Sequence, residues 1–212
     1  MRVEIWADVA CPWCYVGKRR FERALSRFES RDDVDVIWRS YELDPRAPRA
    51  QPLSGPEVLA RKYRVSVDQA NAMNDRLKGE GRKEDLDLHP ERIRMVNTFD
   101  AHRLIHHAGS LGKRPEMVER LFRAYHIEGE TLSDAGTLVK LGTDVGLDTA
   151  STRAVVEGDA YSRDVRDDEE RAASFGISGV PFFAIDEKYG VSGAQPPEHI
   201  LAALTQAMND QS

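Results

Sequence analysis

Two cysteines near the start of the chain are the residues best suited to chemistry. They stand in the stretch Cys11-Pro12-Trp13-Cys14, and the sequence contains no other cysteine. Two thiols separated by two residues can close a small disulfide ring and reopen it through a mixed disulfide with another thiol. The pair therefore predicts thiol–disulfide exchange.

The residues after the pair predict a helix that begins at or just after Cys11. Apolar side chains recur there at helical spacing, at Phe21, Ala24, Leu25 and Phe28. A sulfur at a helix N-terminus lies near unpaired N–H groups and the positive end of the helix dipole, which favour thiolate over thiol. We therefore expect Cys11 to be the nucleophile and Cys14, one turn further on, to be the resolving cysteine. Pro12 suits the first turn, and Trp13 offers an apolar surface beside the reactive sulfur.

Two other interpretations of the pair stay open at this point. A zinc site usually needs a second Cys or His pair at short spacing, and no further cysteine is available. A purely structural disulfide closing so small a loop would constrain little of the chain. Redox or thiol-transfer chemistry is the favoured interpretation.

Composition narrows the class of protein. The 212 residues carry a net charge of −6, which argues against a protein that binds nucleic acid by neutralising phosphates. No apolar run approaches the roughly 20 residues of a membrane span. The N-terminus leads into the cysteine motif without an apolar signal segment, so we expect a cytoplasmic protein. Such a pair would be held reduced there, which fits a catalytic use.

The first part of the chain predicts a βαβ unit. Residues 2–7 form a short apolar run before the cysteines, and residues 34–43 are rich in β-branched and aromatic side chains. A strand, a helix and a second strand in this order imply parallel pairing.

The middle of the chain predicts a long helical insertion. Four prolines occur among residues 45–56, a composition that is typical of a linker. Capping boxes at Ser54 and Ser66 start two helices, and the second is expected to end at Gly79 and Gly81. Pro90 is expected to open a helix that closes at Gly109, and further helices are expected after Pro115, before Gly146 and over residues 150–157.

The last part of the chain predicts a return to the sheet. A helix over residues 160–175 precedes a strand over 177–185 with Pro181 near its entry. A second strand over 189–193 follows so closely that an antiparallel hairpin is the simplest arrangement. Pro196-Pro197 starts a final amphipathic helix. The element order is β-α-β, a helical block, and α-β-β-α.

This order, with C-x-x-C after the first strand and Val-Pro before the third, resembles the α/β thioredoxin fold with the large all-helical insertion of the DsbA family. Specific motifs resemble the FrnE-like branch of that family: residues 11–18 (CPWCYVGK), 97–104 (NTFDAHRL), 178–183 (SGVPFF) and 192–196 (SGAQP). The match extends over nearly the whole chain. It implies a thioredoxin-like domain of residues 1–48 and 159–212, and a helical insertion domain of residues 49–158.

The resemblance also implies an activity and a substrate groove. The family members are thiol–disulfide oxidoreductases in which the residue matching Pro181 has a cis peptide bond and the backbone of Val180 pairs with an extended substrate. Pro12, Trp13, Val180 and Pro181 are therefore the expected substrate-binding residues. The substrate is a protein or small-molecule thiol or disulfide. No cofactor is expected beyond the redox-active disulfide, glutathione is a candidate co-substrate, and relatives make a homodimer a candidate state.

Two alternative functions and one histidine pair bear on the interpretation. Glutathione-dependent 2-hydroxychromene-2-carboxylate isomerases and kappa-class transferases share the inserted fold but generally carry serine where Cys11 stands, so two cysteines favour the oxidoreductase. A binding module that uses the groove alone would need neither thiol. His102 and His106 are four residues apart on one expected helix face, but no third metal ligand can be assigned, so no metal site is predicted.

Overall fold

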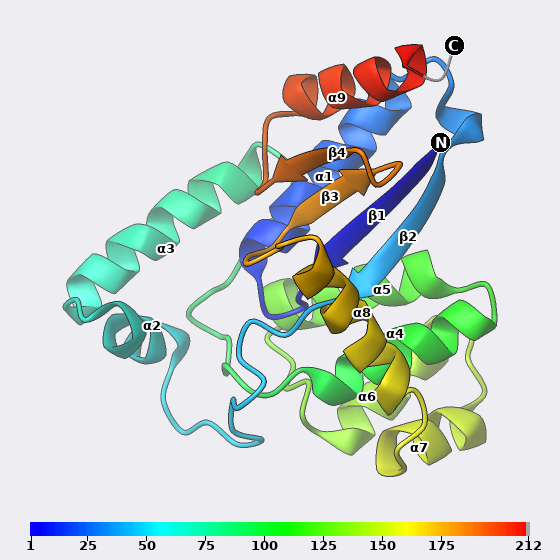
Figure 1. Cartoon of the computed structure of the whole chain (residues 1–212). Coiled ribbons are helices and arrows are strands. Elements are labelled where there is room, and N and C mark those ends of the chain that lie inside the picture. The colour runs from blue at the N-terminus through cyan, green and yellow to red at the C-terminus, as the bar shows by residue number, and fades with distance from the viewer. Residues whose placement is uncertain (211–212) are drawn as a thin grey trace. The chain divides into compact units, whose positions relative to one another are not determined.

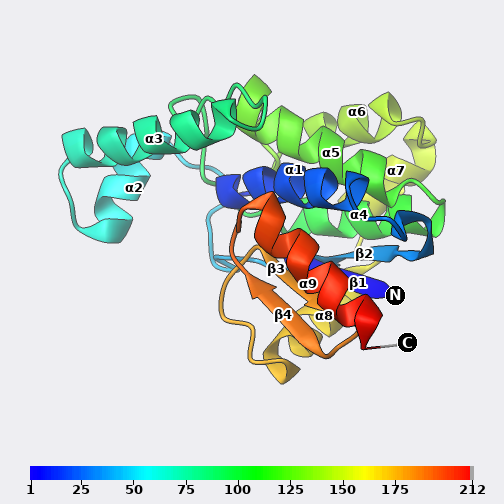
Figure 2. The ribbon, with the colours of Figure 1, turned by 90° about the horizontal axis from the view of Figure 1, so that it is seen from above.

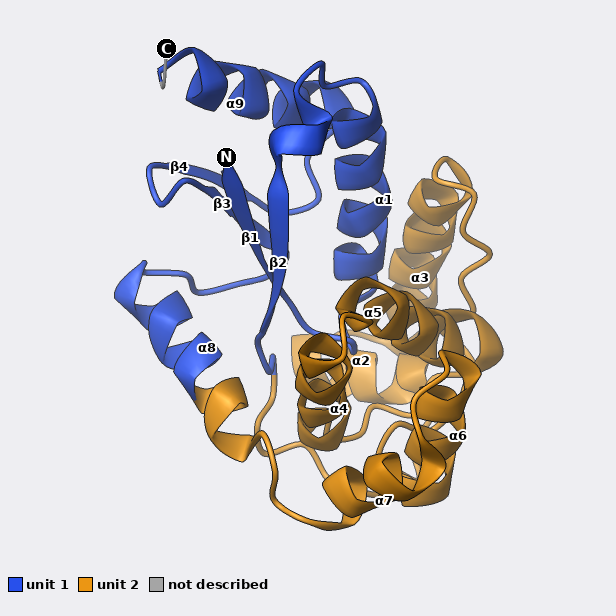
Figure 3. Ribbon diagram, turned by 90° about the vertical axis from the view of Figure 1, so that its right-hand side faces the viewer, with its two compact units in different colours: residues 1–43, 167–212 blue, residues 44–166 orange. Residues whose placement is uncertain are grey.

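The computed structural model describes residues 1–210 and divides the chain into two compact units. Unit 1 comprises residues 1–43 and 167–212, and unit 2 comprises residues 44–166 (Figure 3). These limits differ from the 48/49 and 158/159 boundaries predicted above. The flanking segments make contacts inside unit 2: Asn97 donates its backbone N–H to Pro48 O at 3.0 Å, and Tyr161 bonds to Ser110 at 3.1 Å.

A four-stranded sheet forms the centre of unit 1, in the order β2-β1-β3-β4 (Figure 1). The strands are β1 (Arg2–Ala7), β2 (Asp35–Ser40), β3 (Phe182–Ile185) and β4 (Tyr189–Ser192). β1 pairs in parallel with β2, and the β3–β4 hairpin is antiparallel, as the sequence predicted. β3 runs antiparallel to β1. The strand predicted over 177–185 is shorter, because residues 177–181 form a loop before β3.

Helices cover both faces of this sheet. α1 (Pro12–Ser26) and α9 (Pro197–Asn209) pack side by side, and Phe21 of α1 stacks on Phe183 of β3 with ring centroids 5.6 Å apart. α8 (Ser162–Ser174) lies on the other side of the sheet from α1 (Figure 3). A short 3-10 turn (Arg31–Asp33) joins α1 to β2. Successive side chains of a strand point to opposite faces of the sheet. Ile5 of β1 therefore points towards α1, whereas Glu4 and Trp6 point towards α8.

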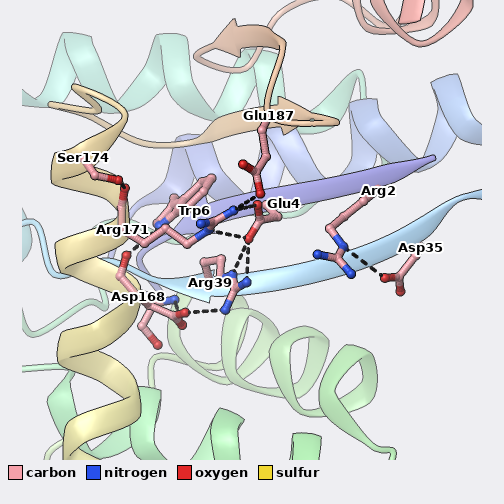
Figure 4. A network of polar contacts seen from close by, with 10 residues as sticks. Arg2, Glu4, Trp6, Asp35, Arg39, Asp168, Arg171, Ser174 and Glu187 are labelled. Carbon is pink, nitrogen blue, oxygen red and sulfur yellow. Dashed lines mark hydrogen bonds and ion pairs between the residues drawn. The ribbon is translucent and has the colours of Figure 1, made fainter. Parts of the chain in front are cut away.

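A charged network attaches α8 to the sheet (Figure 4). Glu4, almost fully buried on β1, accepts hydrogen bonds from Arg39 of β2 and from Arg171 of α8. Asp168 of α8 accepts a hydrogen bond from Arg39 at 2.8 Å and one from the backbone N–H of Ser40 at 2.9 Å. The network thus fixes α8 against the sheet. This helix precedes, in the sequence, the loop that contains Val180 and Pro181.

Unit 2 is helical. Its elements are α2 (Gly55–Tyr63), α3 (Val67–Arg82), α4 (Phe99–Ser110), α5 (Arg114–Arg123), a π-helical turn (Ala124–Glu128), α6 (Ala135–Asp144) and α7 (Thr149–Glu157). α2 and α3 form a hairpin, and α4 to α7 pack as a second group within the unit (Figure 2). The predicted capping box at Ser66 is present, since Gln69 N donates to Ser66 Oγ at 3.1 Å. No helix within residues 1–210 has the length and apolar character needed to cross a bilayer.

Two predicted helix limits in unit 2 are wrong. α3 continues through Gly79 and Gly81, where the missing Cβ of Gly81 lets Leu88 approach: a Cβ there would lie 2.8 Å from Leu88 Cδ1. Pro90 does not open a helix, because residues 91–98 are irregular and α4 begins at Phe99. The side-chain oxygen of Asn97 accepts the Phe99 N–H at 3.0 Å and fixes that start.

Candidate active site

Both cysteines lie where β1 passes into α1. Cys11 is the N-cap of α1 in extended conformation, and Pro12 occupies the first turn, where its missing N–H costs nothing. The backbone N–H of Cys11 donates to Asp8 O at 3.0 Å, and that of Cys14 donates to Cys11 O at 3.0 Å. The turn thus places the two side chains at the start of one helix, as the sequence predicted.

The Cys11 side chain makes its hydrogen bond to a carbonyl oxygen and not to the N–H groups at the helix start, near which the sulfur was expected. Both cysteines are free thiols, and within the described residues the Cys11 side chain makes no capping hydrogen bond to α1. Its thiol instead lies 3.7 Å from the carbonyl oxygen of Val180, to which it donates. Val180, which is expected to face the substrate, is therefore in contact with the Cys11 thiol.

The loop containing Val180 and Pro181 is fixed against α1. The Val180–Pro181 peptide bond is cis, and Pro181 O accepts the N–H of Gly193 at 2.8 Å. Gly17 of α1 lies so close to Pro181 that a Cβ on Gly17 would come within 2.8 Å of Pro181 Cγ. One helix thus holds both the cysteine pair and the seat of Pro181.

The four expected substrate-binding residues differ in their exposure. Trp13 is 40% exposed, Pro12 and Val180 are half-buried, and Pro181 is buried. Trp13 therefore keeps an exposed apolar surface two residues after Cys11, and its role beside the sulfur stays a prediction.

Asp8 is a buried acid close to the cysteine pair, and the sequence did not predict a role for it. One carboxylate oxygen accepts the N–H of Ala10 at 3.0 Å and the other accepts the N–H of Leu43 at 2.7 Å, so it fixes the turn before Cys11. Burial raises the pKa of Cys14 well above its usual range, and the hydrogen bond and charge of Cys11 and the negative charge of Asp8 raise it further. An acidic residue at the end of an apolar strand, three positions before Cys11, was the available signal.

The motif of residues 97–104 has a structural role inside unit 2. The guanidinium of Arg103, buried in α4, donates to Val155 O at 2.7 Å and to Gly158 O at 2.6 Å, which satisfies carbonyls at the end of α7. His102 and His106 are buried on the same helix. Among residues 1–210 no group of three or more His, Cys, Asp or Glu side chains is placed to hold a metal ion.

Comparison with known proteins identifies the family. The model of the DSBA-like thioredoxin domain matches residues 2–205. The chain belongs to this family. A probable DsbA oxidoreductase from Streptomyces coelicolor is 43% identical, with a TM-score of 0.96 over 100% of this chain and 92% of that chain. The uncharacterised protein YwbO of Bacillus subtilis is 30% identical over 190 residues, 88% of each protein.

More distant members of the fold differ in chemistry. A 2-hydroxychromene-2-carboxylate isomerase has a TM-score of 0.71 at 13% identity, over 100% of this chain and 96% of that chain. The cytosolic disulfide reductase DsbM from Pseudomonas aeruginosa has a TM-score of 0.67 at 16% identity, over 99% of each chain. These likenesses establish the fold alone, so the choice between the two chemistries depends on the residues of the site.

Proposed function

We propose that this DsbA-family protein is a thiol–disulfide oxidoreductase in which Cys11 attacks and Cys14 resolves. The observation that supports it best is the placement of two free thiols at the start of α1, with the outer one 3.7 Å from Val180 O. An isomerase that activates a bound thiol would need only one side chain at position 11. The second thiol, which is also buried, is the group that can resolve the mixed disulfide within the chain.

The reaction has two balanced steps. The thiolate of Cys11 attacks one sulfur of the substrate disulfide, the substrate S–S bond breaks, and the leaving sulfur takes a proton. Cys14 then loses its proton and attacks the Cys11 sulfur, which forms the Cys11–Cys14 disulfide and releases the second substrate thiol. The substrate gains two electrons and two protons, which the protein loses, and the reverse sequence oxidises a dithiol.

The raised pKa of Cys14 orders these steps. Because burial keeps Cys14 protonated, Cys11 is the thiol available for the first attack. The negative charges of Cys11 and Asp8 also raise the pKa of Cys14. The contribution of Cys11 is lost when Cys11 is bound in a mixed disulfide, so Cys14 loses its proton more readily at that step.

Substrate binding is proposed at Pro12, Trp13, Val180 and Pro181. The Val180 backbone faces the sulfur, and the exposed ring of Trp13 supplies an apolar contact. These groups suit an extended peptide or a small thiol. Glutathione is a proposed co-substrate, since a DsbM structure contains GSH. The cytoplasmic location, the homodimer and the FrnE-like branch stay predictions.

A glutathione-dependent isomerase is the second candidate, because its fold is shared. Two variants separate the functions. In a disulfide-reduction assay with a peptide disulfide and glutathione, Cys11→Ser should abolish turnover, and Cys14→Ser should accumulate the mixed disulfide seen by mass spectrometry. Turnover that persists in Cys11→Ser would contradict the mechanism. Isomerisation of 2-hydroxychromene-2-carboxylate that survives in Cys14→Ser would establish the second candidate instead.

A further inference from the structure

The proposed exchange reaction assigns no part to the motif at residues 192–196 (SGAQP), which connects β4 to α9. The backbone of this motif is hydrogen-bonded both to Pro181 and to Arg20 of α1. We propose that Arg20 is a positioning residue for substrate binding: through this turn it holds the Val180 backbone where an extended substrate pairs with it. The inference rests on the proposed thiol–disulfide exchange and gives a part in it to a residue outside the cysteine pair.

The turn is attached to the loop that carries Val180 and Pro181. The backbone N–H of Gly193 donates to Pro181 O at 2.8 Å, just beyond the last pair of the β3–β4 ladder, Phe182 and Ser192. Gly193 has a φ of +79°, a conformation that glycine adopts without the strain of other residues. A displacement of this turn therefore displaces Pro181.

Hydrogen bonds within the motif keep the turn in one conformation. The backbone N–H of Gln195 donates to Gly193 O at 2.9 Å, and the side-chain amide of Gln195 donates to Ser192 O at 2.9 Å. These residues are thus held as one unit. A contact made at Ala194, between Gly193 and Gln195, therefore also fixes Gly193.

Arg20 ties this turn to α1. The side chain is half-buried, and its Nη1 donates to Ala194 O at 2.7 Å. A hydrogen bond from a charged donor is shorter and stronger than one between neutral groups. Gly17 lies three residues earlier on the same face of the helix, and a Cβ there would lie 2.8 Å from Pro181 Cγ and 3.6 Å from Ala194 Cβ. One face of α1 therefore contacts both the loop and the turn.

The loop is thus held from two points of one helix, and all of the contacts lie in unit 1. At the start of α1, the Cys11 sulfur lies 3.7 Å from Val180 O. Further along the helix, Arg20 holds the turn that is bonded to Pro181. Loss of the Arg20 hydrogen bond leaves the backbone contacts of the cysteine pair in place but frees the second point. Binding of an extended substrate should therefore weaken, whereas the chemistry of the thiols should not change.

Single-turnover oxidation of the reduced full-length protein tests this role. The protein is mixed with an excess of a disulfide-bonded peptide or of hydroxyethyl disulfide, and formation of the Cys11–Cys14 disulfide is followed by thiol trapping and mass spectrometry. Arg20→Met removes the donors and keeps a long unbranched side chain. The peptide concentration that gives half the maximal rate should rise about tenfold, while the limiting rate stays within about twofold of the wild type.

Three comparisons separate positioning from a general loss of structure. Hydroxyethyl disulfide has no peptide backbone to pair with Val180, so its rate constant should be the same in Arg20→Met and in the wild type. Arg23→Met removes the same charge from an exposed position of the same helix and should leave both reactions unchanged. Arg20→Lys keeps a cationic donor and should restore part of the peptide affinity.

An unchanged half-saturating peptide concentration in Arg20→Met would overturn the inference. So would an equal loss with hydroxyethyl disulfide, because Arg20 would then act on the fold as a whole, and so would an Arg20→Lys variant that binds the peptide no better than Arg20→Met. A wild-type protein that neither disulfide oxidises would instead refute the proposed exchange reaction, so the two failures are distinguishable.

Discussion

Gly17 of α1 and Pro181 of the β3-entry loop approach so closely that no side chain fits between them. A Cβ on Gly17 would lie 2.8 Å from Cγ and 3.4 Å from Cβ of Pro181. Glycine inside a helix costs about 0.5–1 kcal/mol relative to alanine, so its presence here needs a reason. The reason is the close approach of the helix that carries Cys11 and Cys14 to the loop that carries Val180.

Gly17→Ala should therefore slow disulfide exchange and lower the free energy of unfolding by about 1–3 kcal/mol, as overpacking does. The added methyl group must displace Pro181 and with it the Val180 carbonyl beside Cys11. Exchange kinetics and urea unfolding measure the two effects. Gly79→Ala is the control: its Cβ would meet nothing within 4 Å, so the protein should gain about 0.5–1 kcal/mol and keep its activity. Unchanged exchange in Gly17→Ala would show that the contact does not position the loop.

Alkylation should distinguish the two thiols. Because burial raises the pKa of Cys14, we expect iodoacetamide at pH 7 to modify Cys11 well before Cys14 in the folded protein. Peptide mapping by mass spectrometry gives the two rates. Unfolding in urea should make the rates similar, which is the internal control. Faster modification of Cys14 than of Cys11 in the folded state would reverse their assigned roles.

The order of the elements around the sheet could be predicted from the sequence because its signals are local. Apolar runs mark β1 and β3, capping boxes mark α2 and α3, and the cysteine spacing marks the start of α1. The start of α4 was missed because Ile93 and Val96 are buried in irregular chain, where their spacing imitates a helix.

The parts of the site that the sequence did not reveal depend on contacts between distant segments. Gly17 looks like an ordinary helix glycine until Pro181 is seen against it. Asp8 looks like a turn residue until its carboxylate is found bonded to the backbone of Leu43 after β2. Residue type and spacing indicate the chemistry of Cys11 and Cys14, but only the packed chain reveals what holds them in place.

Glu4 should be a major contributor to the stability of unit 1 at neutral pH. Burial alone would raise the pKa of Glu4, but hydrogen bonds from Arg171 and Arg39 outweigh it and lower that pKa. Glu4→Gln leaves the two arginines facing a neutral amide, and we expect the free energy of unfolding to fall by about 3 kcal/mol. Glu198→Gln removes an exposed partner of Arg27 and should cost less than about 0.5 kcal/mol.

The Glu4 contribution should also depend on pH. Because its folded pKa lies below the unfolded value, the stabilisation is present above about pH 4.5 and is lost as the pH falls through the folded pKa. Urea unfolding at pH 7 and pH 3 should therefore show a smaller acid loss for Glu4→Gln than for the wild type. Equal destabilisation by Glu4→Gln and Glu198→Gln at pH 7 would show that the network adds nothing beyond a surface pair.

His107 of α4 should make unit 2 sensitive to mild acid. Its ring packs 5.8 Å from that of Tyr161, and among the described residues neither ring nitrogen has a hydrogen-bond partner. Burial lowers the pKa of His107, so the folded state holds the ring neutral while the unfolded chain takes up a proton below about pH 6.5. The contribution of the neutral His107 ring to stability is therefore complete above that pH and declines as the pH falls towards the lower folded pKa.

His107→Leu should reduce the difference in unfolding midpoint between pH 7.5 and pH 5.5, whereas His199→Gln, at an exposed position of α9, should leave it as in the wild type. An undiminished difference in His107→Leu would assign the acid sensitivity to other groups.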